Sequence, residues 1–349
     1  MKKILLASCW LFLVVQGMAQ NKSKEFIIRS IAFYNLENLF DTIDNPDTYD
    51  EASPILELKG NKAAVYWDKI DKLASVLAQI GADKTHTAPS CIGLAEVENR
   101  EVLEDLIKNK YLKPFDFEII HYDSPDTRGI DVAFLYQKTH FNPINHEVFS
   151  LLLFEQNKRI YTRDQLLVSG YLDNVLIHFI VNHWPSRRGG EAKSRHLREK
   201  AAYVSKTIIN GLKEQDLMAR IMMMGDFNDD PINSSFKTVL ETKASKKKLQ
   251  NGDLFNPFEN LFKKGYHTLG HRDQINLFDQ IILSASLTEN HQKHPKDYFI
   301  YKAGIFNKSY LTTQNGKYKG YPFRSFSNGN YTGGYSDHYP VFVHLIKEK

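Results

Sequence analysis

The sequence predicts an α/β fold with buried sheets, because short apolar runs of strand length alternate with amphipathic helical patterns. The runs are rich in Ile, Val and Phe and read "RSIAFYN", "CIGLAE", "DVAFLY", "VLIHFIVNH", "RIMMMGD", "DQIILS" and "YPVFVHL". No flexible linker, composition break or internal repeat divides the chain. We therefore expect one domain over residues 20–349.

Two helices are predicted between these strands, since apolar side chains recur there with helical spacing. The segment "WDKIDKLASVLAQIG" should end at Gly81, and "AKSRHLREKAAYVSKTIINGL" should end near Gly211. The apolar stripes consist of Ile70, Leu73, Leu77 and Ile80 in the first helix and of Leu197, Ala201, Val204 and Ile208 in the second.

The first 19 residues predict an export signal. Two lysines precede an apolar run from Ile4 to Val15, and the small residues Gly17 and Ala19 stand where a signal peptidase reads the chain. The run is shorter than the about 18–20 apolar residues that span a bilayer. We expect cleavage near Ala19, export to the periplasm or beyond it, and a monomeric mature protein without a stable membrane anchor.

Composition excludes a disordered or fibrous chain, since 42% of the 349 residues are apolar and 25% are charged. The net charge is +4, and loss of Lys2 and Lys3 with the signal would lower it to +2. Overall charge therefore does not by itself indicate a polyanionic partner. Cys9 would also leave, so only Cys91 remains and no intrachain disulfide is expected.

Polar side chains collect where the apolar strands begin or end. An antiparallel or mixed sheet brings the carboxyl ends of some strands beside the amino ends of their neighbours, so we expect these side chains to line one rim. They are Asn35, Glu37, Glu96, His183, Asp226, Asn228, Asp279, Asp337 and His338.

This set of residue types indicates a metal-assisted hydrolysis. So many carboxylates would repel one another unless a hard divalent cation lay among them, which favours Mg²⁺ or Mn²⁺, with Ca²⁺ also possible, over thiolate-bound zinc. The rim holds no Ser or Cys nucleophile, so water is the expected attacking group. Phosphoester hydrolysis is the reaction that most needs a metal ion and several donors around its oxyanion.

The segment from Thr288 to Tyr335 is poor in aliphatic residues and rich in Tyr, Phe, Lys, Asn and Gly. Its aromatic rings alternate with the cations Lys302, Lys308, Lys317, Lys319 and Arg324. Such a segment can stack on and neutralise a nucleic acid or another phosphorylated ligand. An ordered surface insert without a ligand explains the same composition equally well.

The ordered motifs "YNLEN", "AEVEN", "NHW", "GDFND", "DQIILS" and "SDHYPV" resemble the endonuclease/exonuclease/phosphatase superfamily, and the resemblance extends from Ile31 to Leu345. That superfamily contains deoxyribonuclease I, abasic-site endonucleases, sphingomyelinases and inositol-polyphosphate phosphatases. The resemblance implies a four-layer α/β sandwich, in which two packed mixed or antiparallel β-sheets are flanked by helices.

The same resemblance implies a metal site and a water-orienting pair. Glu96 would be the principal metal ligand, with Asn35 and Glu37 beside it and Asp337 near the ion. Asp226 and Asn228 would orient the nucleophilic water and the phosphate.

Two histidines also acquire roles from the resemblance. His338 would contact the phosphate or transfer a proton, with Asp279 holding its ring. His183 resembles the second histidine of the deoxyribonuclease branch, where a carboxylate partners it. In "RGIDVAFLY" we expect Asp131 to be that partner.

The branch within the superfamily is suggested by two further segments. Inositol phosphatases usually carry a Trp-Cys-Asp-Arg type motif where this chain reads "NLFDQ", which argues against that branch. The segments "NHWPSRRGG" and "KSRHLREKAA" resemble a secreted bacterial nuclease-like subgroup, in which Arg187 and Arg188 would grip flanking phosphates. Arg324, from the aromatic segment, is a further predicted substrate-binding residue.

We therefore predict an exported, metal-dependent phosphodiesterase that acts as a nuclease on DNA or RNA. Two alternatives remain open at this point. One is a secreted phosphatase or sphingomyelinase-like lipid phosphodiesterase of the same fold. The other is a catalytically silent binding protein that keeps the sandwich as a scaffold.

Overall fold

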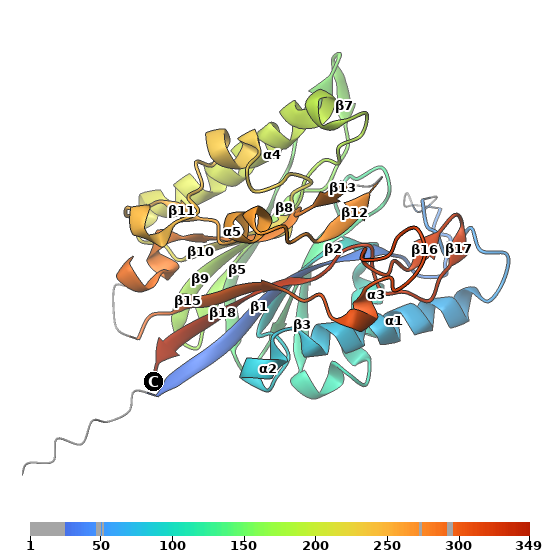
Figure 1. Cartoon of the computed structure of the whole chain (residues 1–349), viewed down its shortest axis with the longest axis horizontal. Coiled ribbons are helices and arrows are strands. Elements are labelled where there is room, and N and C mark those ends of the chain that lie inside the picture. Colours follow the sequence, from blue (N-terminus) through green and yellow to red (C-terminus); the bar gives the residue numbers. More distant parts are fainter. Residues whose placement is uncertain (1–24, 47–49, 51, 272–273, 292–295) are drawn as a thin grey trace, which may run out of the picture.

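Two six-stranded sheets form the centre of the molecule (Figure 1). The computed structural model describes residues 25–46, 50, 52–271, 274–291 and 296–349. The first sheet has the order β15 (Phe299–Ile305), β18 (Val341–Glu348), β1 (Phe26–Leu39), β2 (Cys91–Val97), β4 (Asp131–Gln137) and β3 (Phe117–His121). The second has the order β11 (Leu254–Phe255), β14 (Asp279–Ser284), β10 (Ile221–Asp226), β9 (Val175–His183), β8 (Gln165–Leu172) and β5 (Phe141–Phe149).

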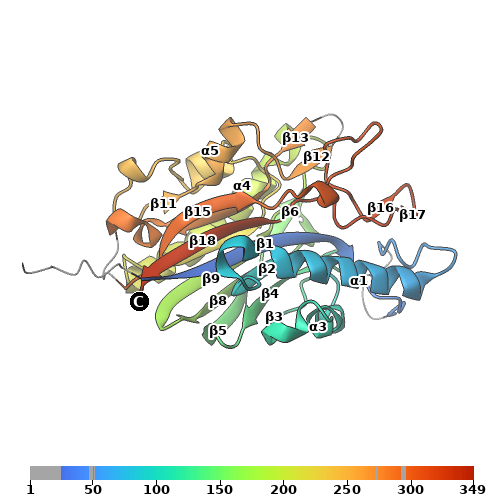
Figure 2. The same ribbon diagram turned by 60° about the horizontal axis from the view of Figure 1, so that its bottom comes forward.

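Helices cover the outer faces of the two sheets (Figure 2). On the first sheet lie α1 (Lys62–Gln79), α2 (Ala82–Thr85) and α3 (Arg100–Lys108), and on the second lies α4 (Glu191–Gln215). The short α5 (Phe258–Lys263) adds Phe258 to the core between the sheets. Three small hairpins contain the remaining strands of the described chain: β6–β7 (Leu153–Glu155, Lys158–Ile160), β12–β13 (Leu269–His271, Gln274–Asn276) and β16–β17 (Phe326–Ser327, Asn330–Tyr331).

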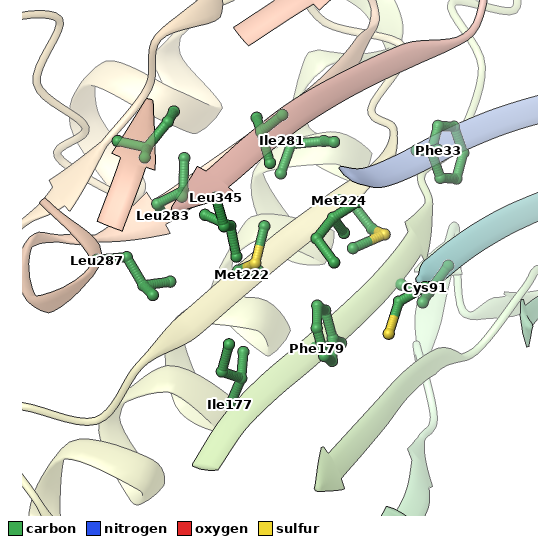
Figure 3. Packing of buried hydrophobic residues seen from close by; sticks show 14 of the residues in the cluster. Phe33, Cys91, Ile177, Phe179, Met222, Met224, Ile281, Leu283, Leu287 and Leu345 are labelled. Carbon is green, nitrogen blue, oxygen red and sulfur yellow. The ribbon is translucent and has the colours of Figure 1, made fainter. Parts of the chain in front are cut away.

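The central strands are buried on both faces, and the two-residue period of a strand divides their side chains between two cores. In β10, Met222 and Met224 enter the core between the sheets (Figure 3), whereas Ile221 and Met223 pack with α4. A Cβ on Gly93 would lie 2.6 Å from the sulfur of Met224, so a larger residue at this position would have to displace the Met224 side chain between the sheets. These layers are the predicted four-layer sandwich, which is confirmed.

The strand directions create the predicted rim. β1 runs parallel to β2, and β9 runs parallel to β10, so the carboxyl ends of each pair lie together. β18 is antiparallel to β1, and β14 is antiparallel to β10, so the amino ends of these two strands reach the same edge. Polar residues from both ends of the strands therefore meet at one end of the sandwich.

Two expectations about elements need correction. The second predicted helix does not end near Gly211, because α4 continues to Gln215 and buries Leu212 beyond the glycine. The segment from Thr288 to Tyr335 is not only a surface insert, since it contributes β15 as an edge strand that pairs with β18.

Among the described residues, no helix is long and apolar enough to cross a membrane. The predicted signal peptide, residues 1–19, lies outside the described residues.

Candidate active site

Three neighbouring strands of the second sheet present polar side chains at one level. Asp226, the last residue of β10, is paired with His183 on β9 and with Asp279 on β14. From the first sheet, the amide nitrogen of Asn35 donates to Asp226 Oδ2 at 3.1 Å. The site therefore lies where the ends of the two sheets meet.

Asp279 and His338 form the contact that the sequence predicts. The carboxylate oxygen Oδ2 lies 2.7 Å from His338 Nδ1, and both side chains are buried. Burial lowers the pKa of His338, but the charges of Asp279 and Asp226 outweigh it and raise that pKa well above its usual value. The ring is thus held as an imidazolium, whose Nε2 lies 3.8 Å from Asp226 Oδ2 and 3.9 Å from Asp337 Oδ1.

Asp226 is the central carboxylate of the site. Its Oδ1 accepts the backbone N–H of Asn228 at 3.0 Å, while Oδ2 accepts from Asn35. Burial, followed by repulsion from Asp279, raises the pKa of Asp226 to about 6, although the charge of His338 opposes this. The Asn228 side chain donates to the carbonyl of Trp184 at 3.0 Å, which fixes the loop after β10 against the end of β9.

Glu96 lies on the other side of Asp226, at the end of β2. Its φ of 62° is in the left-handed region, a strained conformation for glutamate that turns the chain at the end of the strand. Oε2 accepts the backbone N–H of Asn38 at 2.9 Å. Among the described residues Oε1 accepts no hydrogen bond, and its neighbours are Arg128 at 3.7 Å and His183 at 3.8 Å.

The predicted partnership of His183 with Asp131 is wrong. Asp131 lies beside His121, whose Nε2 is 3.1 Å from Oδ2, and it also accepts the backbone N–H of Ser124 at 2.7 Å. His183 Nε2 is 3.6 Å from Asp226 Oδ2, while its buried Nδ1 has no hydrogen-bond partner in the described part of the chain. Burial, then the charges of Arg163 and Arg128, hold the pKa of His183 well below its usual value, so the ring is neutral.

The contacts of Glu37 also differ from the expectation of a metal ligand beside Glu96. Its buried carboxylate accepts the backbone N–H groups of Ser325 at 2.5 Å and of Phe326 at 3.3 Å. A third donor is Arg324, whose Nε lies 3.4 Å away. A carboxylate that is buried needs such donors, and here they turn it toward the start of β16 rather than toward Glu96. Glu37 therefore anchors that segment.

The three arginines predicted to bind substrate differ in how many of their donors are already used within the protein. Arg187 was expected to grip phosphates, but its guanidinium bonds to Asp229 at 3.3 Å and Asp230 at 3.2 Å and stacks on Phe278, which corrects that expectation. Its Nε donates to the carbonyl of Asn228, so it holds the loop of the site in place. The two other predicted cations are Arg188, which is exposed, and Arg324, which bonds to Asp337 at 3.0 Å.

A sequence profile described as "Endonuclease/Exonuclease/phosphatase family" matches residues 30–347, which include every residue of the site. This chain belongs to the endonuclease/exonuclease/phosphatase family. Enzymes of this family are phosphoric ester hydrolases that use divalent metal ions, and this chain is such a hydrolase. No curated protein matches the sequence at a significant level.

Solved structures share the fold of this family member. A D. rerio TDP2 complexed with single-strand DNA product is 14% identical with a TM-score of 0.53, and 91% of this chain and 98% of that chain are covered. An endonuclease/exonuclease/phosphatase family protein from Bacteroides thetaiotaomicron is 16% identical with a TM-score of 0.53, and the match covers 93% of this chain and 97% of that chain. The B. thetaiotaomicron VPI-5482 mannosyl-6-phosphatase is 16% identical with a TM-score of 0.52, and the match covers 91% of this chain and 99% of that chain. At these identities the likeness shows the fold alone.

The donors at the rim fit the divalent ion that the family uses. Glu96 Oε1 is an acceptor with no hydrogen bond from the described residues. Asn35 lies on the neighbouring strand, and its amide oxygen accepts the backbone N–H of Glu37 at 2.9 Å and keeps a second lone pair. Ligand atoms of Asp226, Asp279 and His338 also lie within 4.8 Å of one another, but the last two are already bonded together. Carboxylate and amide oxygens suit a hard cation.

A large cavity adjoins the site of this hydrolase. It has a volume of about 1340 Å³ and reaches Asn228 and Asp337. Its walls come from the loop before α4, from the β12–β13 hairpin and from residues between Thr313 and Thr332. Rings and cations occur together in its lining, which includes Arg188, Phe278, Lys317, Tyr318, Tyr321, Phe323 and Arg324.

Sequence reasoning missed the cluster behind His183. Buried Arg163 donates to Asp126 at 2.8 Å and to the carbonyl of Trp184 at 2.8 Å. Arg128 follows in the same loop as Asp126 and approaches Glu96. In the sequence, this cluster is marked only by Arg128, which stands directly before "GID". That position does not predict that the β3–β4 loop folds over the rim.

Proposed function

We propose that this family member is an exported phosphodiesterase that hydrolyses nucleic acid with Mg²⁺ or Mn²⁺, and that residues 20–349 act as one monomeric catalytic domain. The observation that carries the substrate proposal is the cavity beside Asn228 and Asp337. Its tyrosines Tyr318 and Tyr321 offer faces on which bases stack, and Lys317 and Arg188 offer charges for the flanking phosphates. The TDP2 structure with a DNA product supports the same substrate class.

In this proposal Glu96 and Asn35 hold the metal ion, and Asp337 lies near it at the mouth of the cavity. The ion would supply Lewis-acid neutralisation of the phosphate oxygens. Glu96 is suited to this position because one of its oxygens is fixed by Asn38 and the other faces the site.

The remaining residues act on the water and the phosphate. Asp226, oriented by Asn35 and by the backbone of Asn228, accepts the proton of the attacking water. His338 is held by Asp279 with Nε2 toward the site, and as an imidazolium it stabilises the negative charge that grows on the phosphate. Neutral His183 adds a hydrogen-bonding ring nitrogen between Glu96 and Asp226.

The substrate assay uses purified protein lacking residues 1–19 with plasmid DNA, single-stranded DNA, RNA, sphingomyelin and mannose 6-phosphate, each with EDTA, Mg²⁺ or Mn²⁺. We expect hydrolysis of nucleic acid only when the metal ion is present. The matched variants Lys317→Ala and Tyr318→Ala should raise KM for nucleic acid while leaving a small chromogenic phosphodiester unaffected. Hydrolysis of the lipid or the sugar phosphate alone would refute the nuclease proposal.

A phosphomonoesterase is the second candidate, because the mannosyl-6-phosphatase has the same fold over 91% of this chain and because the cavity also carries many hydroxyl and amide groups. Release of inorganic phosphate from the sugar phosphate would favour it.

Export has a separate test, since an extracytoplasmic protein that begins at Gln20 supports cleavage after Ala19, whereas one that begins at Met1 refutes it.

A further inference from the structure

Arg128 has a guanidinium group without a hydrogen bond to any described residue, although it lies at the rim of the site. Its NH2 nitrogen is 3.7 Å from Glu96 Oε1, and its Nε is 3.9 Å from Asp126 Oδ1. Both distances exceed a hydrogen bond. The side chain is 39% exposed, so its donors remain open to a ligand that enters the site.

The backbone that carries Arg128 is nevertheless held firmly. Asp126 accepts the backbone N–H of Arg128 at 2.9 Å, and its own carbonyl accepts from Gly129 at 3.1 Å. The Asp126 carboxylate is 3% exposed and is bound by Arg163 at 2.8 Å. The backbone of this turn is therefore fixed, while the guanidinium that it carries has no hydrogen-bond partner among the described residues.

The support is joined to the reacting part of the site. Arg163 also donates to the carbonyl of Trp184, and the same carbonyl accepts the side chain of Asn228 at 3.0 Å. A chain of hydrogen bonds thus runs from Asn228 through Arg163 to the turn of Arg128. These bonds fix the backbone from which the Arg128 side chain extends relative to the residues that orient the water.

Arg187 and Arg324, unlike Arg128, already use their guanidinium donors within the protein. The guanidinium of Arg187 is bonded to Asp229 and Asp230, and that of Arg324 is bonded to Asp337 and Glu37. A guanidinium whose donors are not used within the protein can bind two oxygens of a phosphate.

We propose that Arg128 binds a non-bridging oxygen of the phosphoryl group under attack, and that Asp126 and Arg163 are positioning residues for it. The guanidinium would lie on the Glu96 side of the phosphate, opposite His338. Because the phosphate gains charge as water attacks, this contact strengthens in the transition state. The inference rests on the hydrolase activity of the family and not on nucleic acid as the substrate.

The alternative role for Arg128 is charge balance, in which the guanidinium only offsets Glu96 and Asp126. Such a role affects stability and metal affinity but not phosphate affinity. The two roles therefore make different predictions for a binding measurement that needs no turnover.

The test compares wild type with Arg128→Gln and Arg128→Lys, and Arg159→Gln is the matched control. Arg159 is an exposed arginine that stacks on Tyr161 on the β6–β7 hairpin. Isothermal titration with inorganic phosphate in Mg²⁺ should show affinity at least tenfold weaker for Arg128→Gln, an intermediate loss for Arg128→Lys and no change for Arg159→Gln. Hydrolysis of bis(p-nitrophenyl) phosphate should fall about 10²-fold in kcat/KM for Arg128→Gln.

Two further readouts separate positioning from folding. Asp126→Asn should weaken phosphate binding in the wild-type background but not in the Arg128→Gln background, since it acts through the guanidinium. The Mg²⁺ concentration for half-maximal activity should not rise in Arg128→Gln, because a positive neighbour is removed from Glu96. Unchanged phosphate affinity in Arg128→Gln, or a loss seen only as a higher Mg²⁺ requirement, overturns the proposal. The titration decides even if the chromogenic ester or nucleic acid proves to be no substrate.

Discussion

At the scale of single residues, the hydrogen bond between Asp279 and His338 leads to a kinetic prediction. An imidazolium stabilises a developing oxyanion more than it stabilises the bound ester, so His338→Ala should lower kcat by about 10²–10⁴ with little change in KM. Asp279→Asn should cost less, because the ring keeps a hydrogen-bond partner and loses only the charge that raises its pKa. Steady-state kinetics on the best substrate of the wild type provides the measurement.

The double variant of these two residues is the control for their coupling. Two groups that act as one unit give a combined loss smaller than the product of the single losses. Multiplicative losses would mean that Asp279 does not act through His338, despite the 2.7 Å contact.

Glu37 predicts a pH dependence of stability. Burial, and then repulsion from Asp337, raises the pKa of Glu37 to about 7 in the folded protein from the usual 4.5. The folded state therefore binds a proton that the unfolded state releases, and the stability linked to this group is complete below pH 4.5 and is lost as pH rises through about 7. The substituted glutamine cannot titrate, so the free energy of unfolding of Glu37→Gln does not lose this contribution as pH rises. The difference in the free energy of unfolding between wild type and Glu37→Gln should therefore shrink from pH 5 to pH 8 by roughly 1–3 kcal/mol.

The measurement is chemical denaturation of both proteins at pH 5, 6, 7 and 8 without added metal. Taking the difference between variant and wild type cancels the titration of other buried groups, provided that they are unaffected by the change. A difference that is constant or that widens with pH would contradict the raised pKa of Glu37.

At the scale of elements, the passage of α4 through Gly211 predicts a stabilising substitution. The glycine lies in the helix, is exposed, and has no atom within 4 Å of the position of an added Cβ. Gly211→Ala should therefore stabilise the protein by about 0.5–1 kcal/mol, because alanine loses less backbone entropy in a helix.

Gly190 offers the matched control for this prediction. It is equally open to a Cβ but has a φ of +110°, which is unfavourable for alanine, so Gly190→Ala should lower the melting temperature while Gly211→Ala raises it by about 1–2 °C. Two shifts of the same sign in calorimetry would show that backbone conformation is not what separates the two positions.

The elements that carry the site were predictable, and several others were not. β9, β10 and β14 are continuous apolar runs because both of their faces are buried, and such runs are visible in a sequence. β5 was missed because it is an edge strand with mostly exposed side chains and contains Pro143. β8 was missed because Ser169 and Gly170 interrupt its apolar pattern, yet Gly170 is needed where a Cβ would meet Phe141.

The positions of site residues followed from the ends of strands, whereas their partners did not. Which residues follow a strand is written in the sequence, so Glu96, Asp226 and His338 could be named. Where a side chain then points depends on the backbone of the turn. Glu37 has a φ of 51°, and this conformation, together with the donors that the segment from Ser325 offers, was not encoded in any local pattern.

At the scale of the whole molecule, the meeting of two sheets at a carboxylate-rich rim predicts that the hydrolase loses activity without its ion. EDTA should abolish hydrolysis, and Mg²⁺ or Mn²⁺ should restore it. Glu96→Gln keeps the side-chain volume but removes one anionic ligand, so it should raise the metal concentration for half-maximal activity by about tenfold or more. Full activity in EDTA would refute this mechanism, and the exposed Arg159→Gln is the control variant.

The first and last described strands lie side by side, because Phe26 of β1 pairs with Glu348 of β18 (Figure 1). Asn35 comes from the first of these strands, and His338 comes three residues before the second. A ribosome makes Asn35 first, Asp279 later and His338 last, so the three side chains cannot meet before synthesis has reached the residues that precede β18. While the residues before His338 are being made, the nascent polypeptide therefore has no complete site beside the messenger RNA that encodes it.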